Sequence, residues 1–202
     1  MHDHIERGAI QSDESTKEHR ISLPDLLAFA RIVMVPIIMW LVTSTREHAL
    51  GAAAVLFLIA AATDFFDGYL ARRWGITTVL GAFLDSTADK LLVSGTLIAL
   101  VAIERASIWP VLIIIMREFT VMALRGITAM EGHIVKPSMF GKVKANIQFG
   151  AIVFAMLRFS QMWGPLYFDE WLMWLAAGVA VASGWQYASG FWHIVRKIDS
   201  KT

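Results

Sequence analysis

The stretch DFFDGYLARRWGITTVLGAFLDSTAD (residues 64–89) places four aspartates within strongly hydrophobic sequence. Asp64 and Asp67 are three residues apart, and Asp85 and Asp89 are four apart, so on helices each pair lies on one face. Carboxylates in or near hydrocarbon are costly unless they pair, bind cations or face water. A short turn between two helices would bring the two pairs together. This acidic cluster is therefore a candidate functional site.

The composition indicates a membrane protein. The chain has 202 residues, of which 56% are hydrophobic and 17% are charged, which makes it more apolar and less charged than an average soluble domain. It contains no cysteine, which excludes disulfides and cysteine-based zinc or iron–sulfur sites. The formal net charge of +1 gives no indication of nucleic-acid binding, and we expect no nucleic-acid partner.

Six hydrophobic segments are long enough to cross a bilayer, for which about 20 residues are needed. We therefore predict an all-α fold, that of a polytopic membrane protein with six transmembrane helices. Residues 1–20 mix both charge signs without an apolar run. We expect no cleavable signal peptide there and interpret these residues as a polar cytosolic tail, with residues 21–202 as the membrane domain. The expected spans are residues 23–42, 49–72, 78–103, 106–130, 143–163 and 171–195.

The distribution of lysine and arginine predicts the orientation of these spans. Most lysines and arginines outside the spans lie on the side that holds both termini. Because basic residues gather on the cytoplasmic side of a membrane protein, both termini are expected to face the cytoplasm. At about 1.5 Å per helical residue, Arg31, Asp64, Asp89 and Arg117 then lie at similar depths from that side. We interpret them as the walls of one polar cavity, open to the cytoplasm, with an acidic and a basic side.

The residue types indicate the ligands of such a cavity. Clustered carboxylates without cysteine or convergent histidine suit hard cations such as Mg²⁺, Mn²⁺ or Ca²⁺. Two divalent ions would stabilise the attacking and leaving oxygens of a displacement at phosphorus, and arginine binds phosphate through a bidentate fork. Gly68 and Gly81 would let a ligand or a second helix approach closely. Together these features predict a phosphorylated lipid substrate.

The eight fixed positions from Asp64 to Asp89 resemble in full the signature of the CDP-alcohol phosphatidyltransferases, membrane enzymes that displace CMP from a CDP-activated lipid with an alcohol. The resemblance implies two Mg²⁺ or Mn²⁺ ions held by Asp64, Asp67 and Asp85. It implies that Asp89, the fourth carboxylate of the metal site, is the base that deprotonates the acceptor alcohol. The cytidine-diphosphate pocket that it implies is formed by Gly68, Ala71, Arg72 and Gly81.

Two further segments, MREFTVMALRG (residues 116–126) and GKVKA (residues 141–145), are similar to parts of bacterial phosphatidylglycerophosphate synthases. The implied donor is CDP-diacylglycerol and the implied acceptor is glycerol 3-phosphate. Relatives commonly begin the first span with Asn-x2-Thr-x2-Arg, where this chain has Asp25, Ala28 and Arg31. A dianionic acceptor requires additional cations, and the candidates are Arg31, Arg117, Arg125, Lys136, Lys142 and Lys144.

The same resemblance implies a setting for the enzyme. We expect an integral protein of the bacterial inner (cytoplasmic) membrane, in contact with membrane lipids and with its active site facing the cytoplasm. We also expect a homodimer.

Other interpretations stay open at this point. The acceptor could be phosphatidylglycerol, giving cardiolipin, or serine or an inositol phosphate. A cation-coupled transporter would predict an internal repeat, which we do not find, and a structural scaffold gives no reason for four buried carboxylates. Arg31 and Arg117 could pair with the acidic cluster, and Arg125, Lys142 and Lys144 could be interface anchors. We interpret Glu118 as a partner of neighbouring charges, not as a catalyst.

Overall fold

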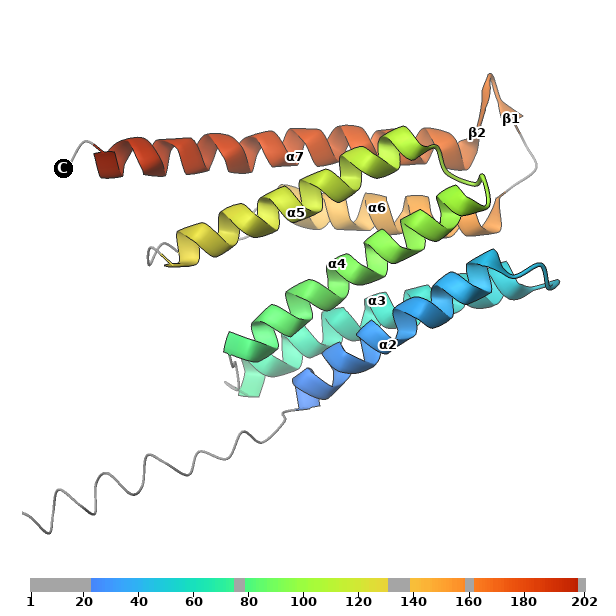
Figure 1. Cartoon of the computed structure of the whole chain (residues 1–202), viewed down its shortest axis with the longest axis horizontal. Helices are drawn as coiled ribbons and strands as arrows, with labels where there is room; N and C mark the ends of the chain where they lie inside the picture. Colours follow the sequence, from blue (N-terminus) through green and yellow to red (C-terminus); the bar gives the residue numbers. More distant parts are fainter. Residues whose placement is uncertain (1–22, 75–78, 131–138, 159–161, 200–202) are drawn as a thin grey trace, which may run out of the picture.

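In the computed structural model the chain forms a bundle of long helices (Figure 1). The structure describes residues 23–74, 79–130, 139–158 and 162–199, and within them the side chains of residues 26–63, 83–128, 143–158 and 162–190. The expected tail, residues 1–20, lies outside the described residues. The elements are α2 (Leu23–Thr43), α3 (Ala49–Trp74), α4 (Val79–Ala102), α5 (Ile108–Met130), α6 (Met139–Leu157), β1 (Met162–Trp163), β2 (Leu166–Tyr167) and α7 (Phe168–Asp199).

The prediction of a helical protein is confirmed, and each expected span corresponds to one of the six helices in these ranges. The expected segment 143–163 was wrong at its end. The helix stops at Leu157, and β1 and β2 pair as a short antiparallel hairpin. Gly164 turns this hairpin at φ 72°, a backbone conformation that glycine adopts without steric cost. The residues Gly164 and Pro165 therefore form a turn. The predicted helix ran too far because the segment stays hydrophobic up to this turn.

The outside of the bundle is apolar. Large side chains such as Trp185 (77% exposed), Trp109 (65%) and Ile108 (60%) lie on the surface, and contiguous apolar surface marks a membrane or partner interface. In the described part, Leu26–Thr43 is the one stretch long and apolar enough to qualify as a membrane span by length and composition, with shorter apolar stretches at Ala49–Thr63 and Val143–Leu157. The number of spans and the side of the termini stay predictions.

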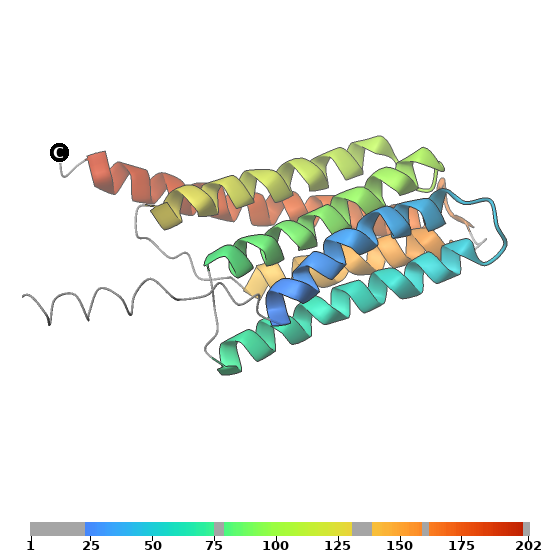
Figure 2. The ribbon, with the colours of Figure 1, turned by 60° about the horizontal axis from the view of Figure 1, so that its bottom comes forward.

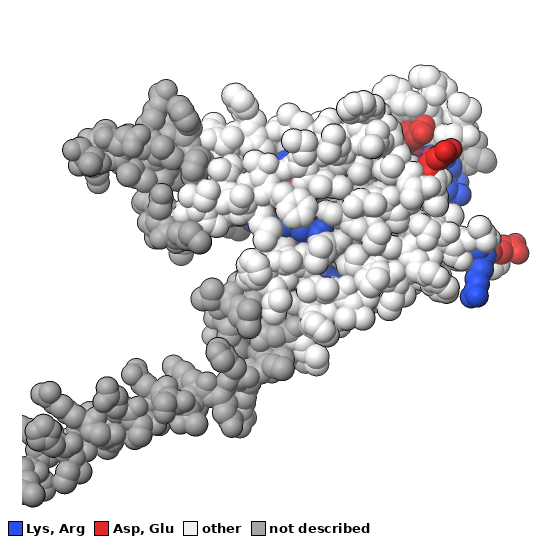
Figure 3. Space-filling model, in the orientation of Figure 1, with Lys and Arg blue, Asp and Glu red and all other residues white. Residues whose placement is uncertain are grey.

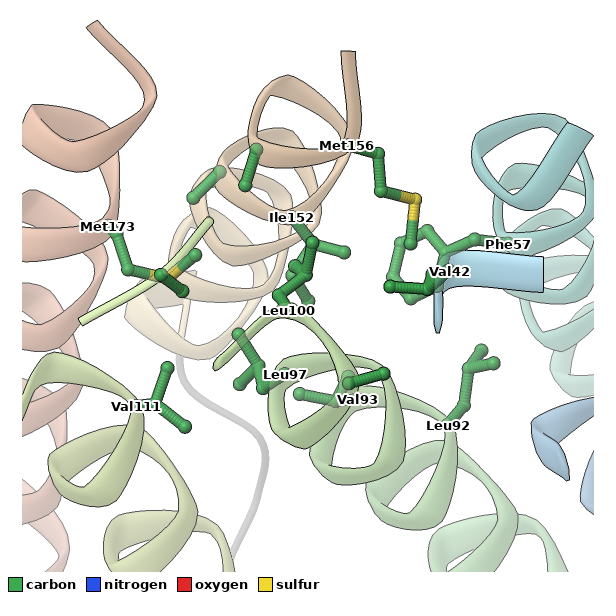
Figure 4. Close-up of a cluster of buried hydrophobic side chains, with 14 of the residues drawn as sticks. Val42, Phe57, Leu92, Val93, Leu97, Leu100, Val111, Ile152, Met156 and Met173 are labelled. Atoms are coloured by element: carbon green, nitrogen blue, oxygen red, sulfur yellow. The ribbon is translucent and has the colours of Figure 1, made fainter. Parts of the chain in front are cut away.

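The core between the helices is built from aliphatic and aromatic side chains of every helix. Figure 4 shows side chains from several helices, including Phe57, Leu97, Leu100 and Ile152, that point toward one another, and these four are completely buried. Alanines of α6 and α7, two helices in contact, are also buried, such as Ala155 and Ala180. Small residues let helix backbones approach closely in a membrane.

One end of the bundle, which we call the closed end, is tied together by polar contacts. Arg105, just after α4, donates a hydrogen bond to the carbonyl of Met156 at 2.9 Å, near the end of α6. Arg158 donates to a carboxylate oxygen of Asp169 on α7 at 3.2 Å and to the carbonyl of Arg105 at 3.3 Å. These arginines satisfy carbonyls that a helix end leaves without partners. Three helix ends are therefore held in one cluster.

At the opposite end the helices diverge, as Figures 1 and 2 show from two directions. We call this the open end; α2, α4 and α6 begin there, and α3, α5 and α7 end there. The residues of the expected site that lie on described helices are on the halves nearer to this end, except Arg117, which lies close to the middle of α5.

Candidate active site

The acidic side of the site is built on α4. Asp85 and Asp89 lie one helical turn apart, on one face of the helix. Arg31 reaches them from α2 and donates a hydrogen bond from Nη1 to Oδ1 of Asp85 at 3.2 Å. The side chain of Arg31 is completely buried, whereas that of Asp85 is 44% exposed. One oxygen of Asp85 is thus held from inside the bundle while the carboxylate stays accessible.

The other signature residues are placed by their backbones only. Asp64, Asp67, Gly68, Ala71 and Arg72 lie on the last part of α3, which contacts α4. Gly81 lies near the start of α4. Their side chains are outside those described. Among the side chains that the structure does describe there is no group of three or more metal-ligating residues, so the four-aspartate cluster is not tested.

The basic side lies on α5 and α6. Glu118 is 7% exposed and forms an ion pair with Lys144, which is 6% exposed. Arg117 lies 3.5 Å from the same carboxylate, measured from Nη1 to Oε1. Asp89 interacts electrostatically with Lys144, so the acidic and basic sides face one another. The interpretation of Glu118 as a partner of neighbouring charges is confirmed.

Arg125 lies two turns further along α5 and contacts α7. Its Nη2 donates a hydrogen bond to the hydroxyl of Tyr187. It forms no ion pair with any carboxylate whose side chain is described. The two remaining basic candidates are Lys136 and Lys142; Lys136 and the side chain of Lys142 lie outside the described residues.

Lys90 is a site residue that the sequence analysis missed. Its Nζ donates hydrogen bonds to the carbonyl and the hydroxyl of Ser86, at 2.9 Å and 2.8 Å. Its charge interacts with that of Asp89 and with those of Arg117 and Arg125, which places it between the two sides. A lysine in the middle of an apolar helix is as unusual as the aspartates. The argument that selected the aspartates, the cost of a charge within a hydrophobic helix, applies equally to Lys90.

Two more residues emerge only from the packing. Tyr187 contacts Arg125, and Gln148 lies on α6 one turn after Lys144. Gln148 is 2% exposed, and its side-chain oxygen has no hydrogen-bond partner among the described residues; the same is true of the buried Nε of Arg117. Buried polar atoms without partners are costly, so these atoms are candidates for contacts with a bound ligand.

The described part of the site carries an excess of positive charge. Apart from the Arg31–Asp85 pair, it contains four cations and two carboxylates, namely Lys90, Arg117, Arg125, Lys144, Asp89 and Glu118. Figure 3 shows basic atoms at the surface in the middle of the bundle, among apolar side chains. A phosphate monoester carries nearly two negative charges at neutral pH. The charge of this described part complements that of such a group; the side chains of Asp64 and Asp67 lie outside it.

A helical bundle with an apolar exterior and charged side chains from several helices inside it is typical of membrane proteins that bind a charged ligand within the bundle. The comparison with known families is more specific. Residues 21–182 match the family model described as CDP-alcohol phosphatidyltransferase, and the chain belongs to this family. Enzymes of the family are bound to membranes and generally use divalent metal ions. This membership decides against the transporter and scaffold interpretations.

Curated relatives cover nearly the whole chain. A protein of Bacillus subtilis (strain 168) is 37% identical over 190 residues, which are 87% of this chain and 97% of the relative. A protein of Rickettsia typhi is 36% identical over 82% of this chain and 94% of the relative, and one of Yersinia enterocolitica is 35% identical over 86% and 96%. Each is named CDP-diacylglycerol–glycerol-3-phosphate 3-phosphatidyltransferase.

Proposed function

We propose that the protein transfers the phosphatidyl group of CDP-diacylglycerol to glycerol 3-phosphate, releasing CMP and forming phosphatidylglycerophosphate. The names of the relatives support both substrates. The observation that carries the proposal is the cluster of basic residues beside Asp89, with Lys90, Arg117, Arg125 and Lys144 coming from three helices. An acceptor that brings its own phosphate needs such a surface, whereas serine does not.

The set of metal-ligating residues fits a pair of divalent ions, Mg²⁺ or Mn²⁺. It consists of carboxylates alone, which are ligands that hard cations prefer, and they lie on two contacting helices. Asp64, Asp67 and Asp85 would hold the ions, with Asp89 as the fourth carboxylate of the site. When bound, the ions supply charge neutralisation for the pyrophosphate and the departing CMP.

Asp89 acts as the base in the proposed reaction. It takes the proton of the acceptor hydroxyl, whose oxygen then forms a bond with the phosphorus of the phosphatidyl group. The bond from this phosphorus to the oxygen of CMP breaks, and CMP leaves with the electron pair. Arg31 fixes Asp85 one turn away, so it keeps the acidic side in place. The cytidine-diphosphate group lies against Gly68, Ala71, Arg72 and Gly81.

The basic side holds the phosphate of the acceptor. Arg117, Arg125 and Lys144 come from two helices, and charge-assisted contacts of this kind are about twice as strong as neutral hydrogen bonds. The Nε of Arg117 and the side-chain oxygen of Gln148, which have no hydrogen-bond partner in the described part of the chain, offer a donor to the phosphate and an acceptor to a glycerol hydroxyl. The remaining proposed acceptor ligands are Arg31, Lys136 and Lys142.

We place this site on the cytoplasmic side of the bacterial inner membrane. All six helices span the bilayer in this arrangement, and both termini face the cytoplasm, as the excess of lysine and arginine on that side indicates. The open end then faces the compartment from which a water-soluble acceptor arrives. The enzyme works as a homodimer.

The test is an acceptor panel. Purified protein is incubated with CDP-diacylglycerol and Mg²⁺, and CMP release is measured with glycerol 3-phosphate, phosphatidylglycerol, serine or an inositol phosphate. We expect CMP release with glycerol 3-phosphate and a product that carries two phosphates. Turnover with serine or phosphatidylglycerol but not with glycerol 3-phosphate would refute the proposed acceptor and leave the family assignment intact.

A further inference from the structure

Tyr187 of α7 lies against the two arginines of α5. The guanidinium carbon of Arg125 is 4.8 Å from the centre of the tyrosine ring, and that of Arg117 is 5.8 Å from it. Both distances are within the range of cation–π attraction, about 6 Å. Arg125 also donates a hydrogen bond to the tyrosine hydroxyl. Two of the four cation–π contacts between described residues thus involve one ring.

The packing of α7 makes this contact close. Tyr187 is only 9% exposed, and Gly184 precedes it by one turn on the same helix. A Cβ atom added at Gly184 would lie 3.2 Å from Cγ of Arg117, which is closer than ordinary van der Waals contact. The missing side chain therefore gives the stem of Arg117 room beside α7. Gly184 and Tyr187 together form a surface that receives Arg117.

Arg158 at the closed end also lies against a tyrosine ring, but it differs from Arg125 in its carboxylate partners. Arg158 lies 4.6 Å from the ring of Tyr167, but it also pairs with the carboxylates of Asp169 and Glu170. Arg125 has no carboxylate partner among the described side chains. An aromatic ring and a neutral hydroxyl hold a guanidinium in place without cancelling its charge. The contacts of Arg158 fasten the fold, whereas those of Arg125 leave its charge free for an anion.

We infer that Tyr187 is a positioning residue for the acceptor, which fixes Arg117 and Arg125 in the orientation that binds the acceptor's phosphate. The inference rests on the proposed function and adds to it a role for α7, a helix outside the signature. Long arginine side chains lose considerable rotamer freedom when they bind a ligand. Tyr187 restricts that freedom before the acceptor arrives, so its effect falls on acceptor binding, not on the displacement at phosphorus.

The experiment uses the full-length protein and three variants. Tyr187→Leu removes both the ring and the hydroxyl, Tyr187→Phe removes the hydroxyl alone, and Trp185→Leu is the control, a change of an aromatic residue on the exposed side of the same helix. For each variant KM for glycerol 3-phosphate, KM for CDP-diacylglycerol, kcat and the melting temperature are measured.

We expect KM for glycerol 3-phosphate to rise about fivefold in Tyr187→Phe, since one hydrogen bond is lost. In Tyr187→Leu we expect a rise of about fiftyfold, since two cation–π contacts are lost together with that hydrogen bond. The values of kcat and KM for CDP-diacylglycerol will change far less, and Trp185→Leu will match the wild type. Tyr187→Phe keeps the buried ring and remains informative if the leucine variant does not fold.

The outcomes separate the two levels of the proposal. An unchanged KM for glycerol 3-phosphate in the folded tyrosine variants, or an equal rise for both substrates, overturns the role of Tyr187 while the proposed function stands. A wild-type enzyme that does not use glycerol 3-phosphate overturns the proposed function, and the inference falls with it.

Discussion

Gly95 of α4 is packed directly against α2, and replacing it by alanine will force the two helices apart. The added Cβ atom would lie 2.6 Å from Cγ1 of Val35 and 3.2 Å from the sulfur of Met39. Carbon atoms in contact are normally about 3.5–4.0 Å apart, so the first contact is roughly 1 Å too short. Val35 is β-branched and has little rotamer freedom in a helix. Relief therefore requires movement of the backbone.

The loss of stability caused by this steric overlap can be separated from the gain in helix propensity by comparison with a second Gly→Ala variant that has room for the added Cβ atom. Gly150 lies inside α6, and a Cβ atom there would meet nothing within 4 Å. Both alanine variants gain about 1 kcal/mol of helix propensity, but only Gly95→Ala suffers overpacking, which costs about 1–3 kcal/mol. At about 2–4 °C per kcal/mol for a chain of this size, the Gly95→Ala variant will melt about 2–12 °C below the Gly150→Ala variant.

The assay is thermal unfolding of both purified variants in the same detergent or nanodisc, followed by CMP release at a temperature where both are folded. Arg31 lies one turn before Val35 on α2, so displacement of this helix will also lengthen the 3.2 Å contact with Asp85 and reduce turnover. Melting temperatures that agree within about 1 °C, far less than 1 kcal/mol would produce, would show that α2 and α4 are not packed as tightly as the distances indicate.

Further predictions concern the chemistry. Removing divalent ions with a chelator will abolish CMP release, and adding Mg²⁺ will restore it; turnover that survives complete metal removal would contradict the two-ion site. Asp89→Asn will lower turnover about 10²–10⁴-fold and leave metal binding largely intact. Asp64→Asn will weaken metal binding itself. An equal loss of metal affinity in both variants would argue against separate roles for the two aspartates. Arg125→Gln will raise KM for glycerol 3-phosphate more than KM for CDP-diacylglycerol, by about 1.5–3 kcal/mol in binding free energy, and Arg46→Gln, an exposed arginine at the closed end, will leave both values unchanged.

The helices and the general position of the site could be predicted from the sequence because both depend on local features. Hydrophobic length identifies a helix in a membrane protein, and charged residues in such a helix identify the site. A pairing of Arg31 with the acidic cluster was predicted as one possibility, and the structure shows it as a contact with Asp85, 54 residues away. The end of the fifth segment was missed because hydrophobicity continues through a hairpin.

The partners of the basic residues could not be predicted. Arg125 and Tyr187 are 62 residues apart, and nothing in the local sequence of α7 distinguishes this tyrosine from one that anchors a helix at the membrane surface. Lys144 and Glu118 likewise meet only because α5 and α6 fold together. The packing of the helices determines which cations are paired with carboxylates and which remain available. The available cations in turn determine where an anion binds.

The difference between the two ends of the bundle bears on how a lipid reaches the site. Arg105 and Arg158 fasten the helices at one end, while the helices part at the other (Figure 2). Pulling a diacyl lipid out of a bilayer costs about 0.8 kcal/mol for each CH₂ group exposed to water. A headgroup that entered between the diverging helices would leave its acyl chains in the bilayer. The donor then never leaves the membrane, and only the small, soluble acceptor has to diffuse in from water.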